Sequence, residues 1–214
     1  MIPLSSIGNK MRALILSDIH GSAIAARQAL SFFDKFNCDR IFLLGDTLYH
    51  GPRNPLPEGH GPMGVVEALT PYKGRITAVR GNCDADVDLM MLDFPIEDEY
   101  AVVEDSNTTL FLSHGHIFEP NCFPANALET LEPANLENGC RKVDAYLYGH
   151  THIWKLEKNF KGVLIVNPGS TSLPKGGNPP TFALYESATG TSPARFSIHR
   201  LDDGSELKCV MCDV

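Results

Sequence analysis

The sequence has no long apolar run and no concentration of positive charge. No stretch of 18 apolar residues occurs among its 214 residues, so no membrane-spanning helix is predicted. No cluster of Lys and Arg appears, and the formal net charge is -8, which disfavours a general nucleic-acid groove and an anionic membrane surface. The N-terminus lacks a basic segment followed by an apolar stretch and a small-residue cleavage site, so we expect a cytoplasmic location.

Cysteines are few and scattered. The chain has six, and a chain of this length can bury a core without disulfide support. Cys209 and Cys212 form a C-x-x-C pair. A zinc or redox site would need a second Cys/His pair or a helix N-terminus, and the sequence shows neither. We therefore interpret the pair as incidental.

The length of the chain favours one domain. Its content of hydrophobic residues (43%) and charged residues (21%) is ordinary for a globular protein. Met11 directly precedes the first strand pattern. We therefore expect an N-terminal extension over residues 1–10 and a single domain over residues 11–214.

Short apolar runs alternate with helical patterns in the first half of the chain. Strands are predicted over residues 13–16, 41–44 and 76–79, and helices over residues 22–36 and 63–69. This β-α-β-α-β order implies parallel strands covered by helices.

The second half is richer in strands. They are predicted over residues 100–103, 110–112, 145–148, 153–156, 163–166, 182–185 and 196–198, with a helix over residues 125–136. We expect the first two of these strands to form a hairpin. The number of predicted strands favours an α/β fold of two packed mixed β-sheets flanked by helices.

Five apolar strand patterns end in side chains that can bind a metal ion. These are Asp18 and His20, Asp46, Asn82, His114 and His116, and His150 and His152. Ligand sites in α/β sheets collect outside the carboxyl ends of the strands, and residues spaced i, i+2 in extended backbone point to the same side. Carboxylate, imidazole and amide oxygen suit Mn²⁺, Fe²⁺, Zn²⁺ or Ni²⁺. Without His116, seven ligands remain, which is too many for one ion and about right for two.

The motifs follow one another in a specific order. The series Asp-x-His, Gly-Asp, Gly-Asn, His and Gly-His-x-His resembles the calcineurin-like metallophosphoesterase superfamily. The segments over residues 45–54, 80–84 and 167–170 resemble the bacterial YfcE-type phosphodiesterases within it. The resemblance extends from Met11 over essentially the whole chain. It implies a phosphodiesterase that uses a hydroxide bridging two divalent metal ions. Mn²⁺ is the first candidate, with Zn²⁺, Fe²⁺, Ni²⁺ and Mg²⁺ as alternatives.

The same resemblance divides the ligands between two ions. It implies that the first ion is held by Asp18, His20 and His152, and that the second is held by Asn82, His114 and His150. It makes Asp46 the bridge, which agrees with the chemistry because a carboxylate can bind two cations and a neutral imidazole cannot. Asp46 and Asn82 are therefore also predicted to be catalytic.

Cys83 departs from the superfamily pattern. Most members carry His after the Gly-Asn, where it is placed to protonate the leaving group or to stabilise the transition state. A thiol does this poorly, so we name His116 and His50 as further candidate proton donors beside the candidate catalytic residue Cys83.

Other residues near the motifs can be interpreted either as functional or as merely structural or solvent-exposed. Arg53, Asn54 and His50 lie in the Pro- and Gly-rich loop after Asp46, and we predict that they contact substrate rather than solvent alone. Four features receive structural roles: Asp84 as a cap or turn residue, residues 167–170 as a turn beside the site, Trp154 in packing and Lys175 at the surface.

Three alternatives remain open at this stage. The same site suits a phosphomonoesterase or a nucleotide pyrophosphohydrolase, and the retromer subunit with this fold acts mainly as a scaffold. Every ligand position is filled here, which favours an enzyme acting on a small phosphate ester. The resemblance also implies a homo-oligomer, although no interface motif is visible.

Overall fold

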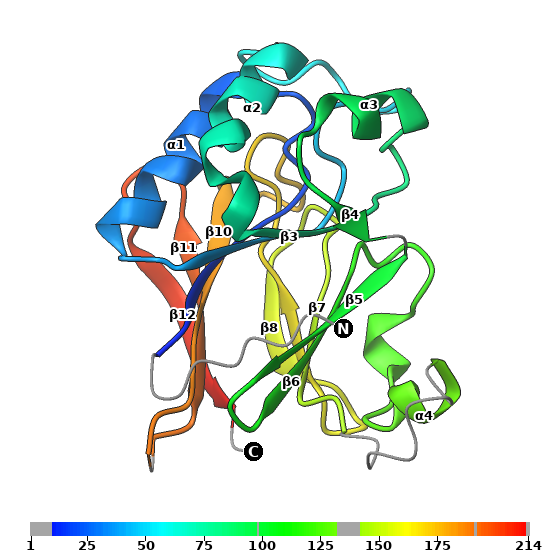
Figure 1. Ribbon diagram of the computed structural model, residues 1–214, viewed down its shortest axis with the longest axis vertical. Coiled ribbons are helices and arrows are strands. Elements are labelled where there is room, and N and C mark those ends of the chain that lie inside the picture. Colours follow the sequence, from blue (N-terminus) through cyan, green and yellow to red (C-terminus); the bar gives the residue numbers. More distant parts are fainter. Residues whose placement is uncertain (1–9, 98, 132–141, 191, 213–214) are drawn as a thin grey trace.

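Two β-sheets form the centre of the molecule (Figure 1). The computed structural model describes residues 10–97, 99–131, 142–190 and 192–212. In chain order the elements are β1 (Arg12–Leu16), α1 (Ala23–Lys35), β2 (Arg40–Leu43), α2 (Pro62–Leu69), a 3-10 helix (Thr70–Arg75), β3 (Ile76–Val79), α3 (Asp86–Met91), β4 (Ile96–Glu97), β5 (Tyr100–Asp105), β6 (Thr108–Ser113), a 3-10 helix (Pro120–Cys122), α4 (Ala127–Leu131), β7 (Ala145–Leu147), β8 (Lys155–Lys158), β9 (Leu164–Asn167), β10 (Thr181–Glu186), β11 (Ala194–Arg200) and β12 (Glu206–Cys212).

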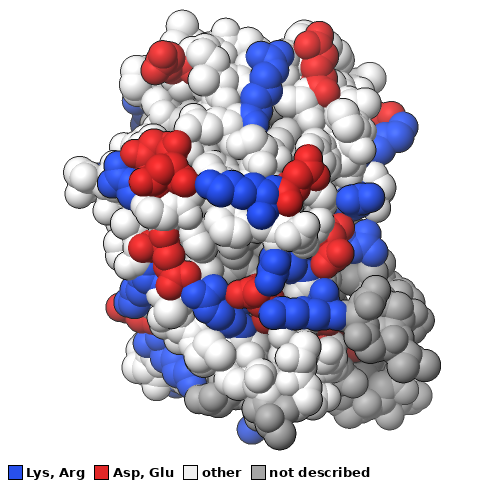
Figure 2. Space-filling view, turned by 90° about the vertical axis from the view of Figure 1, so that its left-hand side faces the viewer, with Lys and Arg blue, Asp and Glu red and all other residues white. Residues whose placement is uncertain are grey.

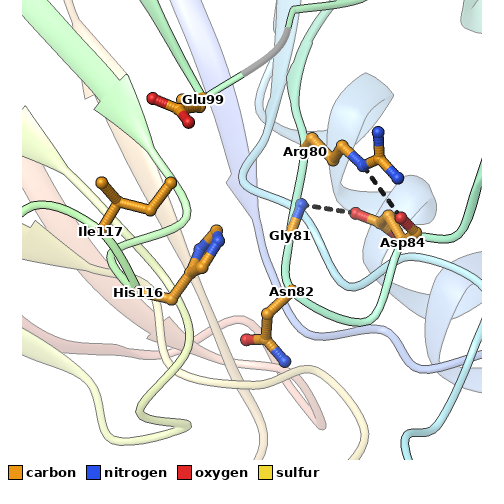
Figure 3. A pocket seen from close by; sticks show the side chains of 7 residues that line it. All are labelled: Arg80, Gly81, Asn82, Asp84, Glu99, His116 and Ile117. Carbon is orange, nitrogen blue, oxygen red and sulfur yellow. Dashed lines mark hydrogen bonds between the residues drawn. The ribbon is translucent and has the colours of Figure 1, made fainter.

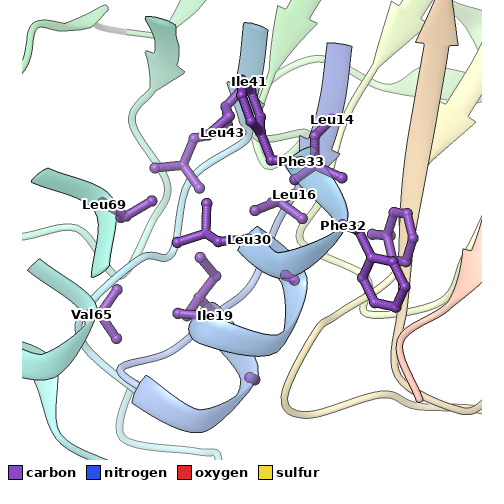
Figure 4. Close-up of a cluster of buried hydrophobic side chains, with 14 of the residues drawn as sticks. Leu14, Leu16, Ile19, Leu30, Phe32, Phe33, Ile41, Leu43, Val65 and Leu69 are labelled. Carbon is purple, nitrogen blue, oxygen red and sulfur yellow. The ribbon is translucent and has the colours of Figure 1, made fainter. Parts of the chain in front are cut away.

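The first sheet has seven strands in the order β12-β11-β10-β1-β2-β3-β4. Strands β1 to β4 run parallel, as the alternating pattern of the first half predicts. Helix α1 begins after Ser22, whose side chain accepts a hydrogen bond from the backbone N–H of Ala25. Helices α1 and α2 cover one face of this sheet, and their apolar side chains pack on Leu14 and Leu16 of β1 (Figure 4).

The second sheet has five strands in the order β5-β6-β7-β9-β8. Strands β5 and β6 form the predicted antiparallel hairpin, and β6, β7 and β9 run parallel. A second apolar core lies between the two sheets. Ala13 and Ile15 of β1 belong to it, because alternate residues of a strand point to opposite faces. Leu110 and Leu112 of β6 belong to it as well. The two mixed sheets with helices outside confirm the predicted fold class.

Several elements differ from the sequence-based expectation. The strand predicted over residues 153–156 is wrong at its start, because β8 begins at Lys155 and His152 has a left-handed backbone (φ 59°). Helix α4 begins at Ala127, two residues later than predicted, and the predicted part after residue 131 lies outside the described residues. Helix α3 and strands β4 and β12 were not predicted.

Three smaller predictions concern the chain ends and the cysteines. Residues 1–9 of the predicted extension lie outside the described residues, whereas Met11 is buried and donates its backbone N–H to Ser187 Oγ at 2.7 Å. Cys209 and Cys212 lie on β12, one exposed and one buried, which agrees with an incidental pair. Within the described ranges, no helix combines the length and the apolar character that crossing a bilayer requires.

Candidate metal centre

The predicted ligands lie in loops that follow the carboxyl ends of β1, β2, β3, β6 and β7. Seven non-glycine residues in the described parts of the chain have a left-handed backbone. Five of them are predicted metal ligands, namely Asp18, His20, Asp46, His150 and His152, with φ between 50° and 64°. This conformation costs free energy at a residue with a side chain, and such strain concentrates at functional sites. The sharp turns direct these side chains toward a common point.

The first group of converging side chains consists of Asp18, His20 and His152. His152 Nε2 lies 3.3 Å from Asp18 Oδ1, and His20 Nε2 lies 3.6 Å from the same oxygen. All three residues are buried. The group corresponds to the ligands predicted for the first ion.

A second group is built around Asp46. Its Oδ2 lies 3.4 Å from His114 Nε2 and 3.7 Å from His20 Nε2, so this carboxylate stands between the two groups. Its other oxygen, Oδ1, accepts a hydrogen bond from the backbone N–H of Cys83 at 2.8 Å. Asn82 Oδ1 lies 3.1 Å from His114 Nε2. Asp46 thus lies between His20 and His114.

Hydrogen bonds fix how the three buried imidazoles present their nitrogens. The Nδ1 atoms of His20, His114 and His152 lie 2.6 to 2.8 Å from the backbone carbonyl oxygens of Tyr49, Leu44 and Leu173. A carbonyl oxygen only accepts, so each Nδ1 carries a proton and each ring directs its Nε2 into the site, where that nitrogen can bind a metal ion once it is unprotonated.

Two of these Nε2 atoms and one carboxylate oxygen converge on a single point. His20 Nε2 and His152 Nε2 face each other at 3.2 Å. Asp18 Oδ1 is buried and has no hydrogen-bond partner among the described residues. Two imidazole nitrogens and an unpartnered carboxylate oxygen around one point form a site that can hold a cation. The donor set, made of carboxylate, imidazole and amide oxygen, fits divalent metal ions.

His150 and Cys83 occupy different places around this centre. The His150 backbone N–H donates to Asp18 Oδ2 at 3.0 Å, and its half-buried ring lies 5.2 Å from the ring of His114. The Cys83 thiol forms a third group with His20 and Asp46, whose ligand atoms all lie within 4.8 Å of one another. The thiol accepts a hydrogen bond from the Asn82 amide at 3.2 Å.

The electrostatics of the centre set the protonation of its groups. Burial opposes a charge on His114, but the Asp46 carboxylate outweighs burial and raises the pKa of His114 to about 9. Burial likewise opposes a charge on Asp46, yet the nearby His114 lowers the pKa of Asp46. Burial and the Asp46 carboxylate together raise the pKa of Cys83 to about 12. Cys83 is therefore a neutral thiol at neutral pH.

Asp84 holds the two loops that carry Asp46 and Asn82. Its buried carboxylate accepts backbone N–H bonds from Asp46 at 2.8 Å, Thr47 at 2.8 Å and Gly81 at 2.7 Å. Burial raises the pKa of Asp84 despite these three donors. Asp84 is a turn-forming residue, as predicted. It also joins the loop that carries Asp46 to the loop after β3.

The turn over residues 167–170 fixes two other loops. Asn167 Nδ2 donates to the carbonyl of Gly149 at 2.7 Å, and Ser170 Oγ donates to the carbonyl of Asp18 at 2.7 Å. Gly149 also packs closely on the loop after β1, because a Cβ there would lie 1.9 Å from Ser17 Oγ. The predicted structural role of this turn is therefore confirmed.

A cleft of about 880 Å³ opens onto the metal centre. Its lining includes Asp46, Asn82, Cys83, His150 and His152, together with Arg53, Asn54, Arg80 and Lys175. The predicted substrate residues Arg53 and Asn54 thus face the centre. His50 is not part of this lining, because its ring packs between Tyr49 and His60. Lys175, predicted to be an ordinary surface residue, lines the cleft.

A smaller pocket of about 350 Å³ adjoins the cleft and shares Arg80, Asn82 and Asp84 with it. Figure 3 shows His116, Ile117 and Glu99 on the side opposite Arg80 and Asp84. The His116 ring lies 5.4 Å from that of His114, and burial lowers its pKa. His116 therefore stands beside the metal centre as a neutral imidazole.

The comparison with known families identifies the class of protein. A model of the calcineurin-like phosphoesterase superfamily domain matches residues 11–190, which is more than half of the chain. The chain therefore belongs to the calcineurin-like phosphoesterase superfamily and is a metal-dependent phosphoesterase. This confirms the resemblance on which the sequence analysis drew.

Particular relatives agree with this assignment. Phosphodiesterase YfcE of Escherichia coli (strain K12) is 40% identical over 176 residues, which cover 82% of this chain and 88% of that protein. The solved structure of YfcE, a phosphoesterase from E. coli, matches with a TM-score of 0.79 and 36% identity, covering 95% of this chain and 100% of that chain. Vacuolar protein sorting 29 from Cryptosporidium parvum matches with a TM-score of 0.60 and 19% identity over 94% of this chain and 96% of that chain, which shows the shared fold alone.

Proposed function

We propose that this protein is a two-metal phosphodiesterase. The observation that carries the proposal is the position of Asp46, whose Oδ2 lies within 3.7 Å of imidazole nitrogens from both sides of the centre. A single carboxylate between two sets of neutral donors suits a pair of ions that share a ligand. The first ion is assigned to Asp18, His20 and His152, the second to Asn82, His114 and His150, and Asp46 serves both.

The chain's own residues prepare this centre for phosphoryl chemistry. When bound, two divalent ions supply Lewis acidity and activate water for attack on phosphorus, so no protein nucleophile is required. The carbonyls of Tyr49, Leu44 and Leu173 hold the imidazoles in the tautomer that can ligate. Cys83 lines the larger cleft, contacts Asn82 and keeps its proton at neutral pH, so it serves as a weak hydrogen-bond donor there rather than as a nucleophile.

A diester fits the shape of the site. The cleft of about 880 Å³ and the pocket of about 350 Å³ meet at Asn82, so space for a substituent exists on both sides of that residue. Arg53 and Asn54 contact the substituent in the larger cleft. His116, a neutral imidazole outside the ligand set, lines the smaller pocket and is assigned a hydrogen bond to the oxygen of the leaving alcohol. The similarity to phosphodiesterase YfcE supports the same substrate class.

The remaining expectations concern the metal, the partners and the location. Mn²⁺ is the proposed ion, because mixed oxygen and imidazole donors suit it, although they also suit Fe²⁺, Zn²⁺ and Ni²⁺. Small phosphate esters are the proposed partners, rather than nucleic acid in general or a membrane. On the face shown in Figure 2, positive and negative side chains are interspersed, which supports this expectation. A cytoplasmic location and a homo-oligomer stay predictions from the sequence.

The test is a matrix of metals and substrates on chelated protein reloaded with one metal at a time. Bis-p-nitrophenyl phosphate and p-nitrophenyl phosphate differ in one ester bond and release the same chromophore. We expect Mn²⁺-loaded protein to prefer the diester. A preference for the monoester under every metal would contradict the proposal and favour a phosphomonoesterase.

A further inference from the structure

The cleft contains two cationic side chains without partners. Arg80 is engaged, because it donates to Asp86 at 2.8 Å and to the backbone carbonyl of Asp84 at 3.0 Å. Arg53 and Lys175 line the same cleft and are exposed. Neither side chain forms a salt bridge or a hydrogen bond to any other described residue. Their positive charges therefore face the cleft uncompensated.

Both residues are held close to the metal centre by their backbones. The N–H of Lys175 donates to the carbonyl of His152 at 3.0 Å, which ties Lys175 to the loop of a proposed ligand. Gly51 lies two residues before Arg53; its φ is +80°, and a Cβ there would lie 2.9 Å from Cys83 Sγ. Asn54 Nδ2 closes this loop by donating to the carbonyl of His50 at 2.8 Å. The two cations thus come from different loops that each contact the centre.

The smaller pocket has a different character. Its lining includes the carboxylate of Glu99 and the exposed apolar side chain of Ile117, which stand on the side away from Arg80 (Figure 3). The free positive charge is therefore confined to the larger cleft. The chain as a whole has a formal net charge of -8, so an anionic substrate gains most from local cations at the site itself.

We propose that Arg53 and Lys175 form a subsite for a second phosphate group on the substrate. The preferred substrate is then a phosphodiester in which one alcohol carries an additional phosphomonoester, and this alcohol lies in the larger cleft. A guanidinium binds phosphate oxygens through two parallel N–H bonds, and an ammonium adds a point charge. This inference rests on the proposed phosphodiesterase function and specifies its substrate class.

A matched pair of chromogenic diesters tests the subsite. The p-nitrophenyl ester of thymidine 5′-phosphate and its 3′-phosphorylated form have the same scissile bond and the same leaving group. We expect kcat/KM to be about tenfold higher for the 3′-phosphorylated form, which corresponds to about 1.4 kcal/mol. The ratio should decrease as salt is raised, because the groups are exposed and screened.

Charge-changing variants show which side chains produce the preference. Lys175→Gln and Arg53→Gln should each lower the ratio about threefold, and the double variant should bring it close to one. Lys175→Arg should retain most of the preference. Lys161→Gln is the matched control, because Lys161 is exposed, lies over the ring of Phe160 and does not line the cleft. The control should keep the wild-type ratio.

Equilibrium binding separates the subsite from turnover. Thymidine 3′,5′-bisphosphate and thymidine 5′-monophosphate are compared by calorimetry, on chelated and on Mn²⁺-loaded protein. The bisphosphate should bind more tightly to both, and the double variant should lose this difference. If the two esters are turned over equally and the two thymidine phosphates bind equally, the proposed subsite is wrong, whereas the proposed phosphodiesterase function still stands. If neither ester is hydrolysed under any metal, the proposed function fails, and the binding comparison still decides the subsite.

Discussion

We expect metal binding at the proposed centre to be coupled to the release of protons. The pKa of His114 is about 9, because the Asp46 carboxylate outweighs the effect of burial. A metal ion needs the unprotonated Nε2 of this ring. At pH 7 only about one molecule in a hundred has that nitrogen free, so the apparent affinity is about 100-fold below its limit at high pH. The affinity should rise about tenfold per pH unit, or about 1.4 kcal/mol, between pH 7 and pH 8.5.

The direction of the effect follows from the raised pKa. Protonated His114 stabilises the metal-free fold fully below its ordinary pKa of 6.5, and this contribution disappears as the pH rises through about 9. The metal-free protein should thus lose stability over the same window in which its metal affinity increases. The pKa of His20 is also raised, because the neighbouring Asp18 carboxylate outweighs burial. More than one proton per chain should therefore be released at the lower end of this window.

Calorimetric titration of chelated protein with Mn²⁺, in buffers that differ in ionisation enthalpy, measures the number of protons released. Two variants that each lack one ligand make the assignment specific. His114→Asn should release one proton fewer than wild type. His150→Asn should bind more weakly but release the same number, because burial lowers the pKa of His150. An affinity that does not change between pH 6.5 and pH 8.5 would contradict the raised pKa of His114 or its role as a ligand.

Two further substitutions test the supports of the centre. Gly149→Ala places a Cβ 1.9 Å from Ser17 Oγ and 2.8 Å from Asp18 Oδ2. It should cost about 1–3 kcal/mol of stability in urea unfolding and weaken metal binding, and unchanged values for both would contradict the packing described. Asp84→Asn replaces one carboxylate oxygen by an amide donor that faces a backbone N–H, so the free energy of unfolding should decrease by about 1.5–3 kcal/mol. Asp86→Asn, a matched change at an exposed carboxylate, should cost less than half as much.

The ligands are readable from the sequence because each follows a buried strand. Asp18 and Asp46 each come one residue after a short apolar run whose length favours a buried strand, and the ends of neighbouring parallel strands meet. The division into two packed sheets follows from the same apolar runs. In contrast, β12 has the sequence Glu206-Leu-Lys-Cys-Val-Met-Cys212 at a sheet edge, where half-exposed residues give only a weak pattern.

The substrate side of the site depends on contacts between distant segments. Lys175 lies in the cleft because its backbone binds the carbonyl of His152, a tertiary contact that no local pattern indicates. His50 lies in the loop after Asp46, yet its ring packs on Tyr49 and His60 instead of lining the cleft. Asp84 was identifiable as a turn residue, but its bonds to Asp46 span 38 residues and require the fold.

The central claim is that Asp46 lies between two metal ions that act together. The most direct measurement is the number of Mn²⁺ ions bound per chain, determined by elemental analysis after gel filtration, in parallel with diesterase activity. The account predicts two ions per chain at full activity for wild type, and loss of both activity and at least one ion for Asp46→Asn. Full activity with a single bound ion, or a variant that keeps two ions and its activity, would contradict it.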